Sequence, residues 1–442
     1  MGMQMHMVNS FDPAGAEALG EPERNLIRRR DAHMGAAYRL FYERPVHLVG
    51  GEGVILRDAD GLDYLDAYNN VPVVGHSNPR VRAAVDRQLS TLNTHTRYLT
   101  DAVVDYAERL TKLFPSPLDQ AIFACTGSEA VDLALRIARQ VTGNAGVVVT
   151  DHAYHGTTSA AAEVSPSLGP WNEIPNHVAL VRAPDSVRDD ASTAMAEFGQ
   201  RIDDAVARLQ ERGVGLAAII VDSVLSSDGL QTGPTNILQV IAQRARAHGA
   251  LYIADEVQPG FGRTGGHWWG FQRHGVVPDL AVLGKPMGNG IPISAVVGRS
   301  DLFEVFGRRV RYFNTFGGNA VSIAAAAAVL DELEERQLLP HAERVGDLLL
   351  ESMRELTRND AGVAEVRGAG LFLAVEFVTP DGEPDASRAG RVVNAMRDRR
   401  ILISASGTYD NVLKVRPPLV FPESAIPRFL DGLSGSLDEV GS

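Results

Sequence analysis

Three short stretches of the chain are apolar without alternating with polar positions: residues 216–221, 251–254 and 280–283. Such runs are typical of parallel strands that are covered on both faces. Helical patterns lie between them, and the one at residues 237–247 is followed by Gly249, a glycine suited to the C-cap. The alternation of strand and helix predicts an α/β domain with a mostly parallel sheet.

The two ends of the chain carry a different pattern. Residues 54–60 and 62–65 predict a hairpin with an Asp-Gly turn. From about Pro340 an amphipathic helical pattern is followed by strand patterns at residues 371–377 and 412–415. These short elements predict a mixed α+β region rather than a continuation of the parallel sheet.

We therefore expect a large central domain over residues 76–339. A small α+β domain would be built from residues 1–75 and 340–442 together. The first dozen residues lack any periodicity, which favours disorder there. No internal repeats or low-complexity arrays interrupt the chain.

Composition excludes several classes of function. The 442-residue chain has a formal net charge of −13 and no long basic block, so we expect no nucleic-acid partner. The short basic run at residues 28–30 predicts a solvated helix face.

The apolar residues 320–330 are too few to cross a bilayer and residues 1–9 do not resemble a signal peptide, so we expect no membrane partner. Cys125 is the single cysteine, which rules out an intrachain disulfide and favours the cytoplasm.

The first stretch that carries chemistry is Thr-Gly-Ser-Glu-Ala at residues 126–130. It joins an apolar strand pattern at residues 121–124 to a clean helical pattern. Gly127 and Ser128 would present free backbone N–H groups and a hydroxyl at a helix N-terminus, which suits a phosphate group. A plain N-cap with Glu129 in the first turn explains the same residues, and the stretch alone leaves both interpretations open.

The second stretch follows the strand pattern at residues 147–150. Tyr154 stands there, and an aromatic side chain at the end of a sheet strand can stack on a flat ligand. A surface loop is the alternative interpretation. His152 and His155 flank Tyr154, but no third ligand stands at a recognisable spacing, so we expect no metal site.

The third stretch begins at Asp255, which closes a very apolar strand pattern. A buried carboxylate is unfavourable unless it meets a cation or several hydrogen-bond donors, and a pyridinium nitrogen would be such a partner. Gly260, Gly262 and Gly265 form a formal G-x-G-x-x-G motif. Because no amphipathic helix follows them, a dinucleotide site and a dehydrogenase are not favoured.

The fourth stretch centres on Lys285, which directly follows the apolar residues 280–283. Most lysines are solvated surface charges, and a Walker A lysine is excluded because Pro286 stands where Ser or Thr is needed. What remains is a lysine at the carboxyl edge of the sheet, where α/β proteins bind ligands. Two weaker signals are the glycine-rich residues 312–319 and Arg416, which stands at a strand end available for a carboxylate or phosphate.

Together these stretches describe one ligand, pyridoxal 5′-phosphate (PLP), with its phosphate, flat ring, ring nitrogen and aldehyde. The order of these stretches and the residues in them resemble the class III aminotransferases of PLP fold type I. The resemblance extends from about Leu40 to Val420. The most specific piece is residues 254–265, followed about twenty residues later by the stretch around Lys285. The resemblance implies PLP as cofactor and a large domain whose mostly parallel, seven-stranded type of sheet is covered by helices.

The resemblance also assigns roles to single residues. Lys285 would bind the aldehyde of PLP and act as the catalytic base, and Asp255 would pair with the ring nitrogen. The other cofactor-binding positions are Val257 and Tyr154 on the two ring faces, Gln258 on the phenolic oxygen, Gly127 and Ser128 on the phosphate, and His155. Thr315 would reach the same phosphate from the other subunit, which makes a homodimer the smallest complete unit.

Five stretches resemble one branch of class III, the alanine–glyoxylate-aminotransferase-2-like phospho-lyases: residues 64–70, 93–99, 284–290, 312–319 and 411–418. Members of that branch act on ethanolamine phosphate or on phosphohydroxylysine. The resemblance therefore implies a β-elimination of phosphate from a phosphorylated amine. With O-phosphoethanolamine the products would be acetaldehyde, ammonia and phosphate.

The residues that would bind the substrate carry weaker signals. Arg416 matches a position that often binds a substrate acid group, whereas other candidates only lie near matched motifs: Arg97, Tyr98, Asn70 and His76. Asp222 departs from the family pattern, because many class III enzymes carry there a glutamate that partners a substrate-binding arginine. The shorter carboxylate leaves the role of Arg416 open.

Two other functions stay open beside the lyase. An aminotransferase of the ω or alanine–glyoxylate type shares the first half-reaction, so the cofactor motifs do not separate it from a lyase. A non-catalytic binding protein with a PLP fold is the third possibility, and the retained Lys285 and Asp255 argue against it.

Overall fold

The centre of the chain forms one seven-stranded sheet. The computed structural model describes residues 9–234 and 236–441. The strands are β4 (Gln120–Ala124), β5 (Gly146–Thr150), β6 (Val178–Val181), β7 (Leu216–Asp222), β8 (Leu251–Asp255), β9 (Leu280–Leu283) and β10 (Ser294–Gly298). They lie in the order β4-β10-β9-β8-β7-β5-β6, and within this sheet only β10 runs against its neighbours. The prediction of a mostly parallel sheet is confirmed.

Helices cover both faces of this sheet, which explains why its strands are apolar throughout. Successive residues of β7 point to opposite faces. Ala218 and Ile220 pack in a core with α4 (Gly127–Thr142), whereas Ile219 and Val221 pack in a second core with α6 (Ala194–Glu211) and α7 (Ile237–Ala247). No face of β7 meets water, so neither set of positions is polar.

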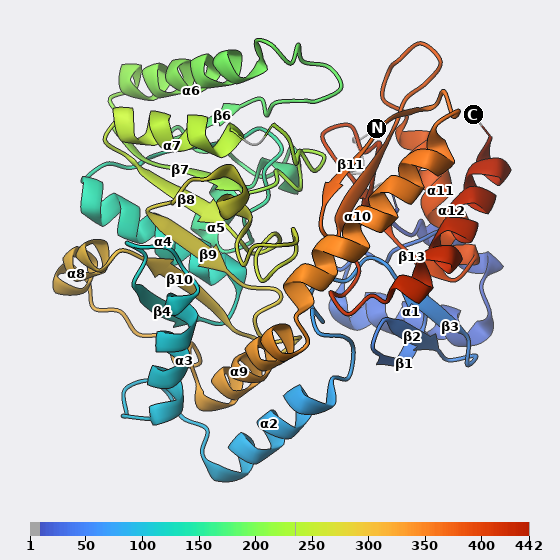
Figure 1. Cartoon of the computed structure of the whole chain (residues 1–442), viewed down its shortest axis with the longest axis horizontal. Coiled ribbons are helices and arrows are strands. Elements are labelled where there is room, and N and C mark those ends of the chain that lie inside the picture. The colour runs from blue at the N-terminus through green and yellow to red at the C-terminus, as the bar shows by residue number, and fades with distance from the viewer. Residues whose placement is uncertain (1–8, 235, 442) are drawn as a thin grey trace.

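The two chain ends share one sheet in the small part of the molecule. Strand β2 (Ile55–Asp58) and strand β3 (Asp63–Asp66) form the predicted hairpin, and β13 (Ile401–Leu402) pairs with β3 in parallel. In Figure 1 the blue N-terminal strands accordingly lie beside the orange and red C-terminal elements. An α+β unit from both ends is therefore confirmed, while its boundaries at residues 75/76 and 339/340 stay a prediction.

The remaining strands complete this small part. They are β1 (Leu48–Glu52), β11 (Val363–Ala369), β12 (Phe372–Phe377), β14 (Ser404–Ser406) and β15 (Val412–Val415). Strand β1 continues the first small sheet, and the others form a second sheet in the order β11-β12-β15-β14. The predicted strands at residues 371–377 and 412–415 correspond to β12 and β15.

The remaining helices lie around the three sheets. They are α1 (Glu21–Met34), α2 (Pro79–Thr91), α3 (Asp101–Lys112), α5 (Ser159–Glu163), α8 (Ser300–Arg309), α9 (Ala320–Glu335), α10 (Leu338–Thr357), α11 (Ala386–Asp398) and α12 (Ile426–Val440). Short 3-10 turns are η1 (Pro13–Ala18), η2 (Pro166–Leu168), η3 (Gly270–His274) and η4 (Glu423–Ala425). The alanine-rich α9 is largely buried, and none of the described helices is long and apolar enough to span a bilayer.

Two predictions about the N-terminal region can be compared with the structure. Arg28 and Arg29 are exposed on α1, as predicted for the basic run, but the prediction is wrong for Arg30, which is half-buried and donates to Tyr38 O at 3.2 Å. The disorder predicted for the first dozen residues falls partly on residues 1–8, which lie outside the described residues. It is wrong for residues 9–12, because Phe11 N donates to Leu40 O at 2.9 Å and anchors the segment.

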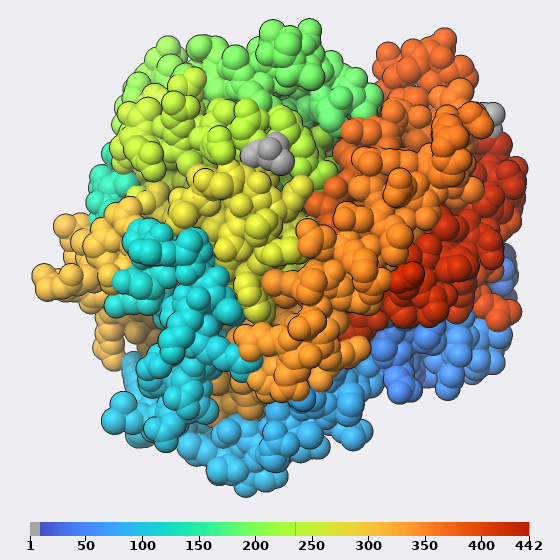
Figure 2. Space-filling view, viewed as in Figure 1, coloured from blue at the N-terminus to red at the C-terminus, as the bar shows by residue number. Residues whose placement is uncertain are grey.

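A buried ion cluster joins the small part to the large one. Glu376 on β12, 2% exposed, lies 2.7 Å from Arg367 and 2.6 Å from Arg188. Arg367 on β11 also donates to the carbonyls of Leu230 and Gly229, which follow β7. Figure 2 shows the orange and red C-terminal part packed directly against the yellow and green central part. Glu376 thus neutralises two arginines at the junction of the two parts.

Glu376→Ala should lower the free energy of unfolding by about 2–3 kcal/mol, because two arginines lose their most buried counterion and keep only the more exposed Glu365 and Asp185. Urea denaturation at equilibrium would measure the change. Glu21→Ala is the matched control, since Glu21 pairs with arginines only on the exposed side of α1 and its loss should leave the curve unchanged. Equal effects of the two substitutions would contradict the role of Glu376.

Candidate active site

The predicted site residues meet at one edge of the large sheet. Strands β4, β5, β7, β8 and β9 point the same way, so their carboxyl ends share that edge. Asp255 ends β8 and lies in register with Asp222 at the end of β7. Tyr154 and Lys285 follow β5 and β9 in the chain, and the Nζ atom of Lys285 lies 5.9 Å from the centre of the Tyr154 ring.

The stretch after β4 is both a helix cap and a candidate phosphate cup. Thr126 caps α4 by accepting from Glu129 N at 3.2 Å, and the Glu129 carboxylate accepts from Cys125 N at 2.6 Å. The N-cap interpretation is therefore confirmed, yet it engages neither of the next two residues. The backbone N–H groups of Gly127 and Ser128 have no hydrogen-bond partner among the described residues and stay available to an anion.

Val257 lies close against the backbone of this cup. A Cβ atom built on Gly127 would stand 3.1 Å from a methyl group of Val257, and one built on Gly284 would stand 3.3 Å from the other. Glycine at both positions lets the Val257 side chain pack between the cup and the strand end that precedes Lys285. Val257 therefore lies directly beside the candidate phosphate cup.

Asp255 is held by hydrogen bonds rather than by an ion pair with Lys or Arg. Its Oδ2 atom lies 2.7 Å from Nδ1 of the buried His155, and its Oδ1 atom accepts from Val257 N at 3.0 Å. Burial and then the negative charge of Asp255 raise the pKa of the Tyr154 hydroxyl. The carboxylate is fixed in one orientation and remains available to a cationic ring nitrogen.

Lys285 is a partly buried amine without a carboxylate partner within 4 Å among the described residues. Burial, and then the charge of Arg416, lower the pKa of Lys285 to about 8, while Asp255 and Asp222 act in the opposite direction. A lysine with such a pKa has a substantial neutral fraction near pH 7, which is the form that attacks an aldehyde or takes up a proton.

Arg416 is linked to Asp222 only through neutral side chains. Its Nε atom donates to Tyr68 O at 3.0 Å, and its Nη1 atom donates to the amide oxygen of Gln258. Gln258 in turn donates to the hydroxyl of Ser226, which donates to Asp222 at 2.6 Å. The short carboxylate at position 222 is thus bound to Ser226 and leaves Arg416 without a carboxylate partner.

Other residues predicted for the substrate lie apart from this group. The Arg97 guanidinium covers the ring of Phe313 at 3.7 Å, and the Tyr98 ring, 64% exposed, stacks on His95. Thr315 is exposed on the loop between α8 and α9. No contact joins Arg97, Tyr98 or Thr315 to Lys285 within the part of the same chain that the structure describes.

The two remaining substrate candidates, His76 and Asn70, are closer to the site. They differ in whether the side chain already has a hydrogen-bond partner. His76 is engaged, because its Nε2 atom lies 2.6 Å from the buried Asp66. Asn70 is buried at 2% exposure, and its side-chain nitrogen has no partner among the described residues. Asn70 is therefore the better placed of the two to donate to a ligand.

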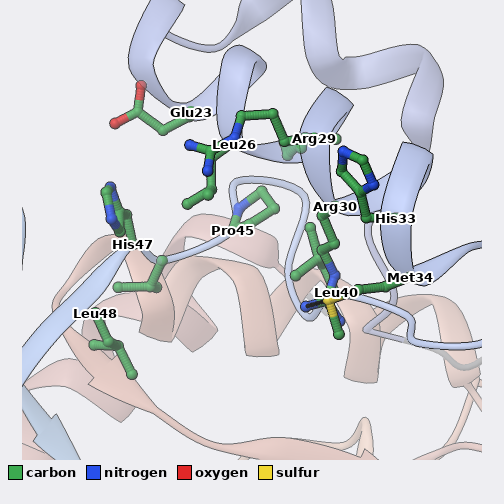
Figure 3. Close-up of a pocket in the computed structure, with 12 residues that line it drawn as sticks. Glu23, Leu26, Arg29, Arg30, His33, Met34, Leu40, Pro45, His47 and Leu48 are labelled. Atoms are coloured by element: carbon green, nitrogen blue, oxygen red, sulfur yellow. Dashed lines mark hydrogen bonds between the residues drawn. The ribbon is translucent and has the colours of Figure 1, made fainter.

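A cavity elsewhere contains none of these residues. It has a volume of about 460 Å³ and lies between α1 and the segment that leads into β1. Figure 3 shows the apolar side chains Leu26, Leu40 and Leu48 around it, together with Arg29 and His33. No lysine lines this cavity, whereas the edge of the large sheet has both Lys285 and Asp255. We therefore place the candidate active site at the sheet edge.

Comparison with known proteins agrees with the site. A family model described as aminotransferase class-III matches residues 41–437, which is most of the chain. The chain belongs to the class III aminotransferase family. Enzymes of this family use PLP, and the residues present fit it: an unpaired lysine for the aldehyde, an oriented carboxylate for the ring nitrogen, and free N–H groups for the phosphate.

Similar proteins within the family carry two kinds of name. A Drosophila melanogaster protein named alanine–glyoxylate aminotransferase 2-like is 40% identical over 440 residues, covering 96% of this chain and 89% of its own. The Caenorhabditis elegans ethanolamine-phosphate phospho-lyase homolog 1 is 34% identical over 91% of this chain and 90% of its own. A solved phospholyase from Arthrobacter, in complex with phosphoethanolamine, is 43% identical with a TM-score of 0.91, covering 93% of this chain and 99% of that one.

Lys285→Ala should reduce turnover by about 100-fold or more even when PLP is bound, because the base for proton removal is lost. The absorbance of bound PLP and the initial rate of amine consumption would be measured on the same sample. Lys112→Ala, which removes an exposed lysine on α3, should keep the wild-type rate. Substantial residual turnover in Lys285→Ala would contradict the role of the amine.

Proposed function

We propose that this protein is a PLP-dependent phospho-lyase that eliminates phosphate from O-phosphoethanolamine, giving acetaldehyde, ammonia and phosphate. One observation carries the proposal: Arg416 is buried near Lys285 and has no carboxylate partner among residues 9–234 and 236–441, because Asp222 is bound to Ser226. A buried guanidinium in that state favours a strongly anionic ligand. The likeness to a phospholyase solved with phosphoethanolamine supports phosphate as that anion.

Each residue of the site has a separate role in the proposed elimination. PLP, when bound, supplies the electron sink for the carbon that carries the nitrogen. The Lys285 amine removes the proton from that carbon, while Asp255, oriented by His155, holds a negative charge toward the ring nitrogen. Arg416 orients the phosphate for departure.

The proposed reaction balances without an oxidant or reductant. The neighbouring carbon–oxygen bond breaks, and its electron pair leaves with the phosphate oxygen. The proton that Lys285 took from carbon ends on the released phosphate. Water then hydrolyses the unsaturated amine to acetaldehyde and ammonia.

An aminotransferase is the second candidate, because the Drosophila relative is named as one. Incubation of the PLP-loaded protein with phosphoethanolamine and no keto acid separates the two. The lyase should release phosphate and acetaldehyde in equal amounts, and Lys285→Ala should release neither. Amino transfer that requires pyruvate or glyoxylate, without release of phosphate, would overturn the proposal. Phosphohydroxylysine, assayed in parallel, tests the substrate.

We also propose that the working unit is a homodimer in which Thr315 contacts the PLP phosphate of the partner subunit. Thr315 stands on an exposed loop. The nearby residues Phe313 and Phe316 in the same loop also have exposed apolar side chains. Tyr98 and the fully exposed Leu99 belong to the neighbouring stretch that packs on Phe313 through Arg97 and His95. Contact with a second copy would remove this apolar surface from water.

Co-expression of two damaged chains tests the shared site. Lys285→Ala and Thr315→Val should each be poorly active at a PLP concentration that just saturates the wild type. Mixed dimers would contain one intact site, built from Lys285 of one chain and Thr315 of the other, so activity should recover to about a quarter of the wild type. Thr315→Ser, which keeps the hydroxyl, is the control. No recovery in the mixed sample would place Thr315 outside the partner's site.

The cytoplasm is the compartment that we propose. The proposal rests on Cys125, a single thiol that can form no intrachain disulfide. Fractionation of cells that express the protein would test it.

A further inference from the structure

Lysine is scarce in this protein. The chain contains only three lysines, at positions 112, 285 and 414, although lysines and arginines together number 42. Lys112 is exposed on α3 and pairs with Glu108 at 3.8 Å. Lys285 belongs to the cofactor site. The third, Lys414, has no role in the site as described so far, and its surroundings are unlike those of the exposed Lys112.

Lys414 is close to Arg416 in the chain. It stands on β15, which ends at Val415, and Arg416 directly follows the strand. Its neighbours across the sheet are Ala374 and Ser404, whose side chains are small. Lys414 is 8% exposed and Arg416 is 7% exposed, so both cations are turned into the interior from the small part of the molecule.

The ammonium of Lys414 has no partner. Its Nζ atom makes no hydrogen bond with, and no ion pair within 4 Å of, any residue in the described ranges 9–234 and 236–441. A surface lysine in that state would be solvated by water, but Lys414 is more than nine-tenths buried. A buried, unpartnered ammonium is unfavourable unless an anion from outside the chain meets it.

Charges near Lys414 place it in the same electrostatic neighbourhood as the catalytic lysine. Burial, together with the charges of Arg416 and Lys285, lowers the pKa of Lys414 to about 7, and Asp222 and Asp228 oppose this shift. From the side of β5, burial and the charge of Lys414 lower the pKa of His152. Lys414 is thus surrounded by elements of the active-site edge on several sides.

The two nearby carboxylates already have other donors. Asp222 accepts from Ser226 at 2.6 Å, and Asp228 accepts from the Thr150 hydroxyl at 2.9 Å. Burial raises the pKa of Asp228 to about 7, so near neutral pH this carboxyl is partly protonated and a weak counterion. Neither group neutralises Lys414 directly.

We propose that Lys414 binds the phosphate group of the substrate together with Arg416 and thereby selects phosphorylated amines over carboxylated ones. Two cations match the two charges of a phosphate dianion, with the planar guanidinium giving a fork and the ammonium a point charge. When the carbon–oxygen bond breaks and its electron pair leaves with the phosphate, Lys414 offsets the added negative charge. The inference rests on the proposed phospho-lyase function and adds the group that recognises its leaving phosphate.

Three variants test the role of Lys414. Lys414→Met keeps the length of the side chain without its charge, Lys414→Arg keeps the charge, and Lys112→Met removes an exposed lysine as a control. For Lys414→Met we expect KM for phosphoethanolamine to rise about tenfold or more and kcat to fall, because the lost contact involves a charged group. Lys414→Arg should recover most of the lost affinity, and Lys112→Met should match the wild type.

A binding measurement separates recognition of phosphate from a structural role. Inorganic phosphate should compete with phosphoethanolamine in the PLP-loaded wild type and should bind Lys414→Met about tenfold more weakly. The absorbance of bound PLP and the thermal midpoint of each variant report whether the fold and the cofactor are retained. Lys414→Gln serves as a second neutral variant if Lys414→Met does not fold.

The outcomes distinguish this inference from the proposed function. Wild-type KM and wild-type affinity for inorganic phosphate in a folded, neutral Lys414 variant would overturn the role of Lys414 and leave the lyase intact. A wild type that releases no phosphate from phosphoethanolamine would overturn the lyase. In that case, the affinity of each variant for inorganic phosphate would still decide whether Lys414 forms an anion site.

Discussion

Charge that is kept buried but unpaired is the constraint on which this molecule depends. A lysine that forms a salt bridge is a poor nucleophile and a poor base, and a carboxylate that forms one is no longer available to a cofactor. The protein prevents both by holding the charged groups with hydrogen bonds to other side chains and to the backbone. His155 and a backbone N–H hold Asp255, while Gln258 and Ser226 separate Arg416 from Asp222.

The fold supplies the rigidity that this arrangement needs. Opposite charges a few ångströms apart would collapse together on a flexible loop, but here the groups follow strand ends in one sheet whose faces are both covered. The small part of the molecule contributes through a single segment, since Lys414 lies on β15 and Arg416 directly follows that strand. The position of these two cations therefore depends on how the two parts dock, which makes the buried cluster around Glu376 relevant to the site as well as to stability.

The sequence predicted the sheet and several residues that meet at its carboxyl edge because those signals are local. An apolar run without alternation identifies a strand buried on both faces, and a lysine directly after such a run is unusual enough to stand out. The partners of these residues could not be predicted, because they come from distant segments: His155 meets Asp255, and Gln258 meets Arg416. One signal in the sequence could have indicated that His155 is a hydrogen-bond partner. His155 directly follows Tyr154, which was predicted to stack on the cofactor at a strand end.

Nearness in sequence was a weaker guide than the strand pattern. Arg97 and Tyr98 were candidates because they stand near a matched motif, yet they pack with Phe313 and His95 on an outer loop. Lys414 shows the opposite case. It stood inside a matched stretch without an assigned role, and only its burial and lack of a partner bring it to attention, neither of which can be read from the sequence.

The scarcity of lysine also has a practical consequence for chemistry on the intact protein. Amine-directed reagents need an exposed, nucleophilic side chain, and of the three lysines only Lys112 on α3 has a largely exposed side chain. Lys285 is engaged by the cofactor in the family's chemistry, and Lys414 is buried. Apart from the chain's own terminus, coupling of the holoenzyme to a dye or a solid support would therefore be directed to one point on one helix. The protein would be tethered in a uniform orientation without the introduction of a new residue.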